Sequence, residues 1–118
     1  MGILDRFEQR VDRTVNGAFA KAFKSEVQPV ELAAALQREL DERAAIVSRG
    51  RTVVPNRFTI SLASEDFDRL AVYAETLQSE MAGLAREYAE EQRYTFLGPV
   101  SVHMQPDDDL DTGIFRVT

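Results

Sequence analysis

The side chains best suited to chemistry lie near the end of this 118-residue chain: one histidine and four aspartates. His103 is the sole histidine, and the chain has no cysteine that could join it at a metal site or act as a nucleophile. Ser101 and Gln105 alternate with apolar residues around it, so we expect His103 to lie on the solvent face of a strand. We therefore predict no catalytic residue, no metal site and no cofactor.

The four aspartates, Asp107, Asp108, Asp109 and Asp111, resemble a calcium loop only superficially. An EF-hand loop needs ligands at alternate positions, glycine at its sixth position and glutamate at its twelfth. Here the twelfth residue from Asp107 is Thr118. The glycines are also too isolated to form a phosphate-binding loop. We predict an exposed, acidic turn over residues 106–113.

Composition indicates an ordinary globular protein. Apolar residues make up 44% and charged residues 29%, and the length suits one domain spanning residues 1–118. Fourteen basic against twenty acidic side chains give a net charge of −6, which disfavours general nucleic-acid binding. With neither a long apolar run nor a signal-peptide core, we expect a cytoplasmic chain.

Periodicity predicts three helices. The first runs from about Leu4 to Phe23, and the second begins at Pro29 and ends at a Gly50 cap. Its expected buried side comprises Ala33, Leu36, Leu40, Ala44 and Val47. The third begins at a Ser64 N-cap and is long and central. Its apolar stripe recurs every three or four residues at Phe67, Leu70, Ala74, Leu77, Met81, Leu84 and Tyr88.

Alternating residues predict the strands. Phe58, Ile60 and Leu62 share one face of a strand over residues 57–62. Shorter strands follow over residues 93–96, 100–105 and 114–118, the last two forming an antiparallel hairpin around the acidic turn. The predicted fold is α+β: two N-terminal helices and one long central helix packed on a small mixed or antiparallel sheet of three to four strands that ends in a hairpin.

The first helix is the basic part of the chain. Residues 1–25 carry five basic and three acidic side chains, against nine and seventeen in the remainder. One interpretation is a core helix with a solvated back. The other is a segment that swings away from the domain and presents an apolar face to a partner or a membrane surface. The candidate docking residues are Arg6, Phe7, Arg10, Val11 and Arg13.

The alternative function is a KH-like module that binds nucleic acid. Such a module also combines three helices with a three-stranded sheet, but its GxxG clamp is absent here. The cluster that could form a basic face comprises Arg38, Arg43, Arg49, Arg51 and Arg57. Titration with RNA or DNA at low salt separates this alternative from a protein-docking function.

Several segments, in this order, resemble the N-terminal domain of actinobacterial FhaA-type proteins. They are Val27 to Leu32 (VQPVEL), Val54 to Ile60 (VPNRFTI), Asp66 to Leu70 (DFDRL) and Thr112 to Arg116 (TGIFR). The resemblance covers nearly the whole chain. It implies a domain that precedes a linker and a C-terminal forkhead-associated (FHA) domain, which reads phosphothreonine and is not part of this sequence.

The resemblance implies a non-catalytic adaptor in serine/threonine-kinase signalling that controls cell-wall synthesis near the inner face of the plasma membrane. The implied partners are a serine/threonine kinase and cell-wall-synthesis proteins. The family pattern also places the candidate phosphoacceptor on the threonine of the T-G-x-F motif, which is Thr112. Phosphate there would add about −1.5 to −2 charges beside the aspartates, with Arg116 as the nearest basic residue in sequence.

Overall fold

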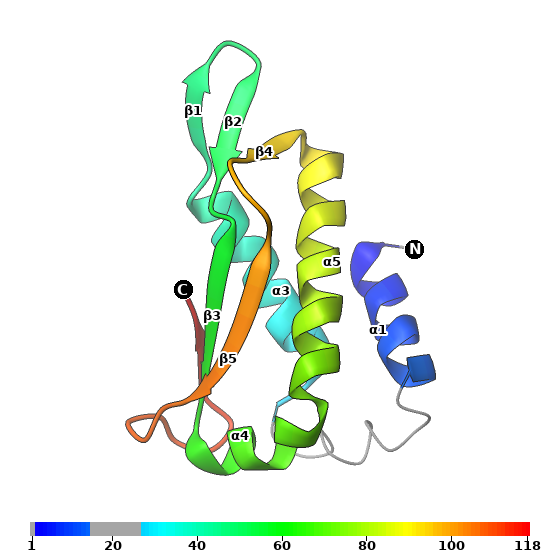
Figure 1. The fold of residues 1–118 in the computed structure, drawn as a ribbon, viewed down its shortest axis with the longest axis vertical. Coiled ribbons are helices and arrows are strands. Elements are labelled where there is room, and N and C mark those ends of the chain that lie inside the picture. Colours follow the sequence, from blue (N-terminus) through cyan, green and yellow to red (C-terminus); the bar gives the residue numbers. More distant parts are fainter. Residues whose placement is uncertain (1, 15–26) are drawn as a thin grey trace.

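Two small sheets lie end to end beside a long helix in the computed structural model, which describes residues 2–14 and 27–118 (Figure 1). The helices are α1 (Ile3–Thr14), α3 (Pro29–Glu42), α4 (Ser64–Leu70) and α5 (Ala74–Gln92), with a 3-10 turn η1 (Ala71–Tyr73). The strands are β1 (Ala45–Ser48), β2 (Arg51–Val54), β3 (Arg57–Leu62), β4 (Tyr94–Phe96), β5 (Ser101–Pro106) and β6 (Phe115–Val117). The α+β class is confirmed.

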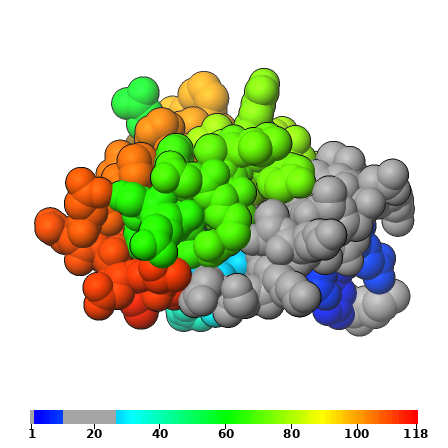
Figure 2. Space-filling model, turned by 90° about the horizontal axis from the view of Figure 1, so that it is seen from below, coloured from blue at the N-terminus to red at the C-terminus, as the bar shows by residue number. Residues whose placement is uncertain are grey.

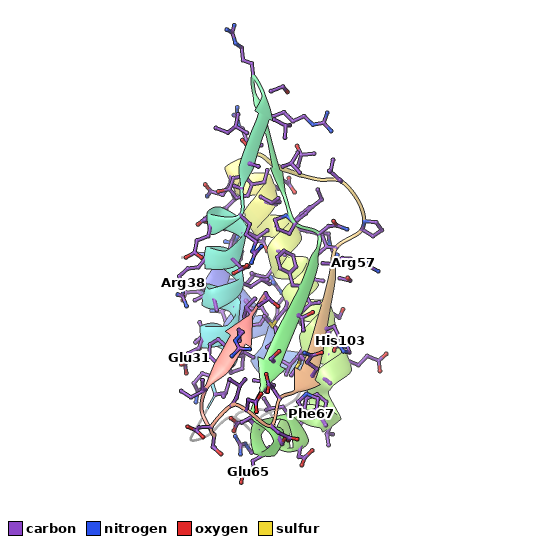
Figure 3. The ribbon with its side chains drawn as sticks, turned by 90° about the vertical axis from the view of Figure 1, so that its left-hand side faces the viewer. Glu31, Arg38, Arg57, Glu65, Phe67 and His103 are labelled. Atoms are coloured by element: carbon purple, nitrogen blue, oxygen red, sulfur yellow. The ribbon has the colours of Figure 1, made fainter. Side chains whose placement is uncertain are left out.

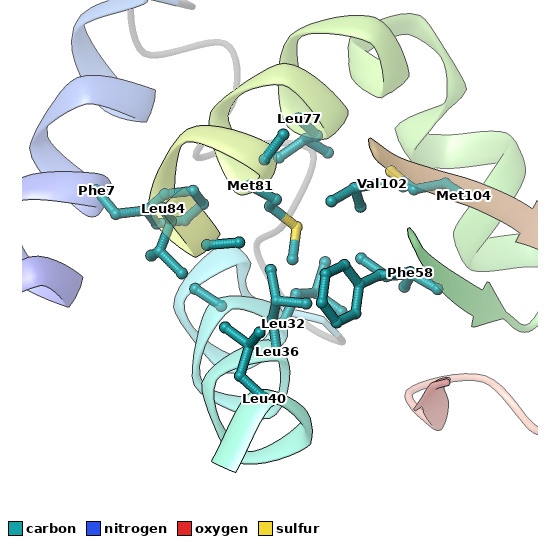
Figure 4. Close-up of a cluster of buried hydrophobic side chains, with 14 of the residues drawn as sticks. Phe7, Leu32, Leu36, Leu40, Phe58, Leu77, Met81, Leu84, Val102 and Met104 are labelled. Atoms are coloured by element: carbon teal, nitrogen blue, oxygen red, sulfur yellow. The ribbon is translucent and has the colours of Figure 1, made fainter. Parts of the chain in front are cut away.

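The apolar stripe of the third predicted helix forms the centre of the core. Leu77, Met81 and Leu84 are fully buried between α3, α1 and the sheet (Figure 4). Phe67 and Tyr88, at the two ends of the stripe, are half-buried. Burying such side chains is the main favourable term in folding, so this stripe organises the domain as predicted.

The predicted helix is nevertheless interrupted. It divides into α4 and α5 at η1, so the chain turns between Leu70 and Ala74 while the apolar spacing continues through the turn. The N-cap is also one residue earlier than predicted, at Ala63 rather than Ser64. The Ser64 hydroxyl instead donates a hydrogen bond to Asp108, which draws the acidic turn toward α4.

The second predicted helix begins correctly but ends too late. Pro29 is its first residue, and the Gln28 amide donates to Glu31 Oε1 at 3.3 Å. The helix ends at Glu42, and residues 45–54 form the β1–β2 hairpin. Gly50 does have positive φ, at 75°, but it lies in the hairpin turn. The predicted burial of Val47 was therefore wrong, because β1 projects from the body of the molecule and Val47 is exposed (Figure 1).

The strands pair in the orders β1-β2-β4 and β5-β3-β6. The central strand β3 has the predicted bounds, and its neighbour β5 runs parallel to it while β6 is antiparallel. The predicted hairpin of the last two strands was wrong, because β3 lies between them. The acidic connection therefore passes around the end of β3 rather than folding β6 back on β5, which brings it to the start of α4 (Figure 1).

Two tyrosines, Tyr88 of α5 and Tyr94 at the start of β4, both contact the C-terminal end of α3. The hydroxyls of Tyr88 and Tyr94 donate to the two carboxylate oxygens of Asp41 at 2.7 and 2.6 Å. Their rings meet edge to face, with centroids 6.3 Å apart. Burial, followed by the hydrogen bond to Asp41, raises the pKa of Tyr88 to about 12.

This pKa predicts a loss of stability at high pH. The raised pKa means that folding favours the neutral phenol, so the contribution of Tyr88 is complete below its usual pKa of about 10 and is lost as the pH rises through about 12. Titration of phenolate absorbance should show one tyrosine ionising last, and Tyr88→Phe should remove that step. If all three tyrosines ionised together near the usual pKa of about 10, the described contacts of Tyr88 would be contradicted.

Candidate regulatory site

The acidic connection between β5 and β6 is folded against the start of α4 rather than extended into solvent. It begins where the Asp107 amide donates to the Leu62 carbonyl at 2.7 Å, directly at the end of β3. The Asp107 carboxylate then accepts the Asp109 amide at 2.9 Å, an interaction typical of an aspartate-initiated turn. Figure 2 looks onto this end of the molecule and shows the connection, in orange to red, lying against α4 in green.

Asp66 is the residue that holds the two segments together. Its side chain is fully buried, and Oδ2 accepts the Gly113 amide at 2.7 Å while Oδ1 is paired with Arg69. A buried carboxylate is stable only when it is paired and hydrogen-bonded, and Asp66 has both kinds of partner. Gly113 itself has a φ of 89°, a conformation that glycine adopts without strain. The positive φ therefore favours glycine at this position of the T-G-x-F motif, whereas the hydrogen bond to Asp66 needs only a backbone N–H.

Thr112 lies at the surface of this turn, one residue before the Gly113 contact. Its hydroxyl donates to Glu65 Oε2 at 3.1 Å, so the residue bridges the turn and the first turn of α4. A polar hollow of about 240 Å³ lies beside it, lined by Ala63, Ser64, Glu65, Asp108, Leu110, Asp111 and Thr112. The side chain is exposed, and its immediate charged neighbours are acidic.

Arg116 is the nearest basic residue in sequence, and it already has a partner at the start of the turn. Its guanidinium lies 3.7 Å from Asp107 Oδ2, and its side chain is exposed. Pairing with a phosphate on Thr112 would therefore compete with this ion pair. The sequence pattern identified Thr112 and Arg116, but it did not identify Asp66 or Glu65 as their neighbours, because α4 lies more than forty residues earlier in the chain.

The first helix does not present the expected apolar face. Phe7 is fully buried beside Leu84 of α5, so the prediction that it is available to a partner was wrong (Figure 4). Arg6 and Arg10 pair across to α5, with Nε atoms 3.1 Å from Glu87 Oε1 and 3.0 Å from Glu80 Oε1. The side chains of Val11 and Arg13 lie outside the described part of the chain, as does the predicted helix beyond Thr14.

The burial of Phe7 predicts the result of deleting this helix. Removing residues 1–22 would uncover the core side chains that Phe7 covers, so we expect the shortened domain to lose stability.

His103 is exposed on β5, as the alternation predicted (Figure 3). Across residues 2–14 and 27–118, no group of three or more histidine, cysteine, aspartate or glutamate side chains is arranged to hold a metal ion. None of the helices within those ranges is long and apolar enough to cross a membrane. The basic residues of the alternative hypothesis are spread from α3 to the start of β3, where Figure 3 labels Arg38 and Arg57.

The architecture is that of a small α+β domain whose T-G-x-F turn is tied to a helix start. Residues 4–118 match the family model "FhaA, N-terminal domain", and the chain belongs to that family. It is 31% identical over 114 residues to the "FHA domain-containing protein FhaA" of Mycobacterium tuberculosis (strain ATCC 25618 / H37Rv), covering 97% of this chain. The match spans 22% of that relative's length.

The fold is also similar to a solved structure, described as "Rv0020c_Nter structure". The TM-score is 0.76 with 31% sequence identity, and the match covers 85% of this chain and 76% of that one. Both comparisons agree with the resemblance noted from the sequence motifs.

Proposed function

We propose that this domain is a non-catalytic docking module of an FHA-containing signalling protein, and that a serine/threonine kinase regulates it through Thr112. Family membership supports the signalling context. The observation that carries the regulatory part is the position of Thr112, exposed and directly before the Gly113 amide that Asp66 holds. The proposed partners are the kinase and proteins of cell-wall synthesis at the inner face of the plasma membrane.

Phosphate on Thr112 would act on the turn through charge. It would replace the hydroxyl that donates to Glu65, and its oxygens accept hydrogen bonds rather than donate them at neutral pH. The added charge would face Glu65, Asp108 and Asp111 around the polar hollow. Repulsion among these groups would push the turn away from α4 and strain the Gly113–Asp66 hydrogen bond, while Arg116 could re-aim the turn by leaving Asp107.

A domain with phosphothreonine incorporated genetically at position 112 tests this response. We expect the Gly113 amide to exchange with solvent about tenfold faster than in the unmodified domain, which corresponds to about 1.4 kcal/mol of lost protection. Phosphothreonine at Thr76 is the matched control, because Thr76 also has acidic neighbours but lies on α5. Unchanged exchange at Gly113, or equal acceleration in both proteins, would contradict the proposed switch.

The docking part is tested by affinity capture. The unmodified and Thr112-phosphorylated domains, used as separate baits, should retain different amounts of at least one protein of the kinase or cell-wall-synthesis class. Identical capture by both would contradict phosphorylation-dependent docking, and capture of neither class would contradict the docking function itself.

A further inference from the structure

The β1–β2 hairpin extends beyond the rest of the domain at the end opposite to the acidic turn (Figure 1). All four residues of β1 are exposed, and Ile46 and Val47 expose 81% and 59% of their surface. Figure 3 shows the hairpin rising clear of α3 and α5. Two aliphatic side chains held this far from the core contribute nothing to its packing, so their exposure requires another explanation.

The hairpin is also where positive charge is concentrated. Residues 45–54, which form the hairpin, contain two arginines and no aspartate or glutamate, whereas the rest of the chain carries twelve basic and twenty acidic side chains. Arg49 lies in the hairpin turn and Arg51 begins β2, and neither forms an ion pair with any residue that the structure describes. The molecule is 45 Å long, several times the screening length at physiological salt, so this positive end acts independently of the acidic turn.

The backbone of β1 supplies the third element of a binding surface. In the order β1-β2-β4, β1 has a neighbour on one side only, and no described strand pairs with its other edge. Such an edge presents unpaired amide and carbonyl groups to any extended chain. We propose that β1 takes up an extended acidic segment of a partner protein as an additional strand, with apolar residues of that segment covering Ile46 or Val47.

A lipid surface fits this hairpin less well. Inserting Ile46 and Val47 into hydrocarbon would also remove the unpaired edge of β1 from water, and each unsatisfied backbone group in lipid costs several kcal/mol. An added strand removes the same apolar surface from water while pairing those groups.

A nucleic acid and a second copy of this chain also fit less well. Residues 43–57 contain no aromatic side chain on which a base could stack, and the aliphatic pair would be left against phosphate or water. Two copies joined through β1 would bring the arginines of both hairpins together, and like charges in adjacent strands repel. An extended acidic segment would do all three things: attract the arginines, hydrogen-bond to the open edge of β1 and cover the apolar side chains.

The test uses a fluorescent eight-residue peptide that alternates Glu and Val, titrated into the unphosphorylated 118-residue domain. Fluorescence anisotropy should show saturable binding, and exchange of the β1 amides should slow on addition of the peptide. A peptide with the same side chains but alternate backbone nitrogens methylated keeps its charge and loses one pairing edge. It should bind about tenfold more weakly or not at all.

The protein variant is Arg49→Glu combined with Arg51→Glu, which reverses two exposed charges. We expect at least about a tenfold loss of peptide affinity, while Arg86→Glu, an exposed change on α5, should leave it unaltered. Lack of peptide binding, equal binding of the methylated peptide, or equal losses in both variants would overturn the proposal. So would binding of anionic vesicles or DNA in preference to the peptide.

This assignment rests on the proposed docking function, but the two can fail separately. If the wild-type domain captures its partners and the Arg49→Glu/Arg51→Glu variant captures the same set equally, only the hairpin assignment is wrong. If the wild-type domain captures none, the docking function fails as well.

Discussion

Replacing Leu77 with alanine is expected to lower the free energy of unfolding by about 2–5 kcal/mol. Leu77 is fully buried at the centre of the core, where α5 faces α3 and the sheet (Figure 4). The truncated side chain would leave a cavity, because the surrounding helices and strands are held by their other contacts and cannot move in to fill it. A domain of this size has only about 5–15 kcal/mol to lose. Urea unfolding followed by circular dichroism measures the difference.

Glu90→Ala is the matched control, because Glu90 lies on the exposed side of the same helix. Glu80 and Glu87 of the same helix are less suitable controls, because they accept hydrogen bonds from Arg10 and Arg6. The control should change stability by less than about 0.5 kcal/mol. Equal losses at Leu77 and Glu90 would contradict the described burial.

The second large effect is expected from Asp66→Ala, at about 1–3 kcal/mol. The change removes the acceptor of the Gly113 amide and the carboxylate that pairs with Arg69. Asp66→Asn should cost less, because an amide oxygen can still accept from Gly113. Exchange of the Gly113 amide and urea unfolding measure the two consequences together.

Asp68→Ala controls for the loss of a negative charge near the start of α4, since Asp68 is exposed. If Asp68→Ala and Asp66→Ala had the same effect, the contribution would be general charge rather than the buried contact. Slow exchange at Gly113 in Asp66→Ala would show that something else holds the turn.

The parts of the fold that were predictable have strong local signals. β3 alternates over six residues, and the α5 stripe continues for several turns, so each pattern has few alternative interpretations. The hairpin formed by β1 and β2 was not predicted, because each strand has only four residues. Ala44 and Val47 continue the helical spacing from Leu40, and four residues are too few for alternation to outweigh it.

Pairing partners were not predictable in the same way. Alternation shows that a segment is a strand, but it carries no information about which strand lies beside it. Consecutive strands are usually neighbours, which favoured joining β5 to β6, yet β6 pairs with β3. The two ends of the Gly113–Asp66 contact are 47 residues apart, and an acidic residue near a helix start already had a local explanation in the helix dipole.

The regulatory hypothesis joins a motif predicted from sequence with a contact found only in the structure. Thr112 was selected from the T-G-x-F pattern, whereas its neighbours Glu65 and Asp66 come from α4. A modification at Thr112 would therefore act on the junction of the C-terminal strand with α4. The hairpin lies at the far end of the molecule, so the two proposed surfaces can operate separately (Figure 1).

The central claim is that Thr112 is the position at which a kinase acts on this domain. The most direct test incubates the domain with the catalytic domain of a membrane serine/threonine kinase from the same organism and maps the modified sites by mass spectrometry. We expect phosphate on Thr112, and Thr112→Ala should lose most of the label while Thr76→Ala retains it. Robust labelling elsewhere with Thr112 unmodified, or no kinase-dependent label at all, would contradict the claim.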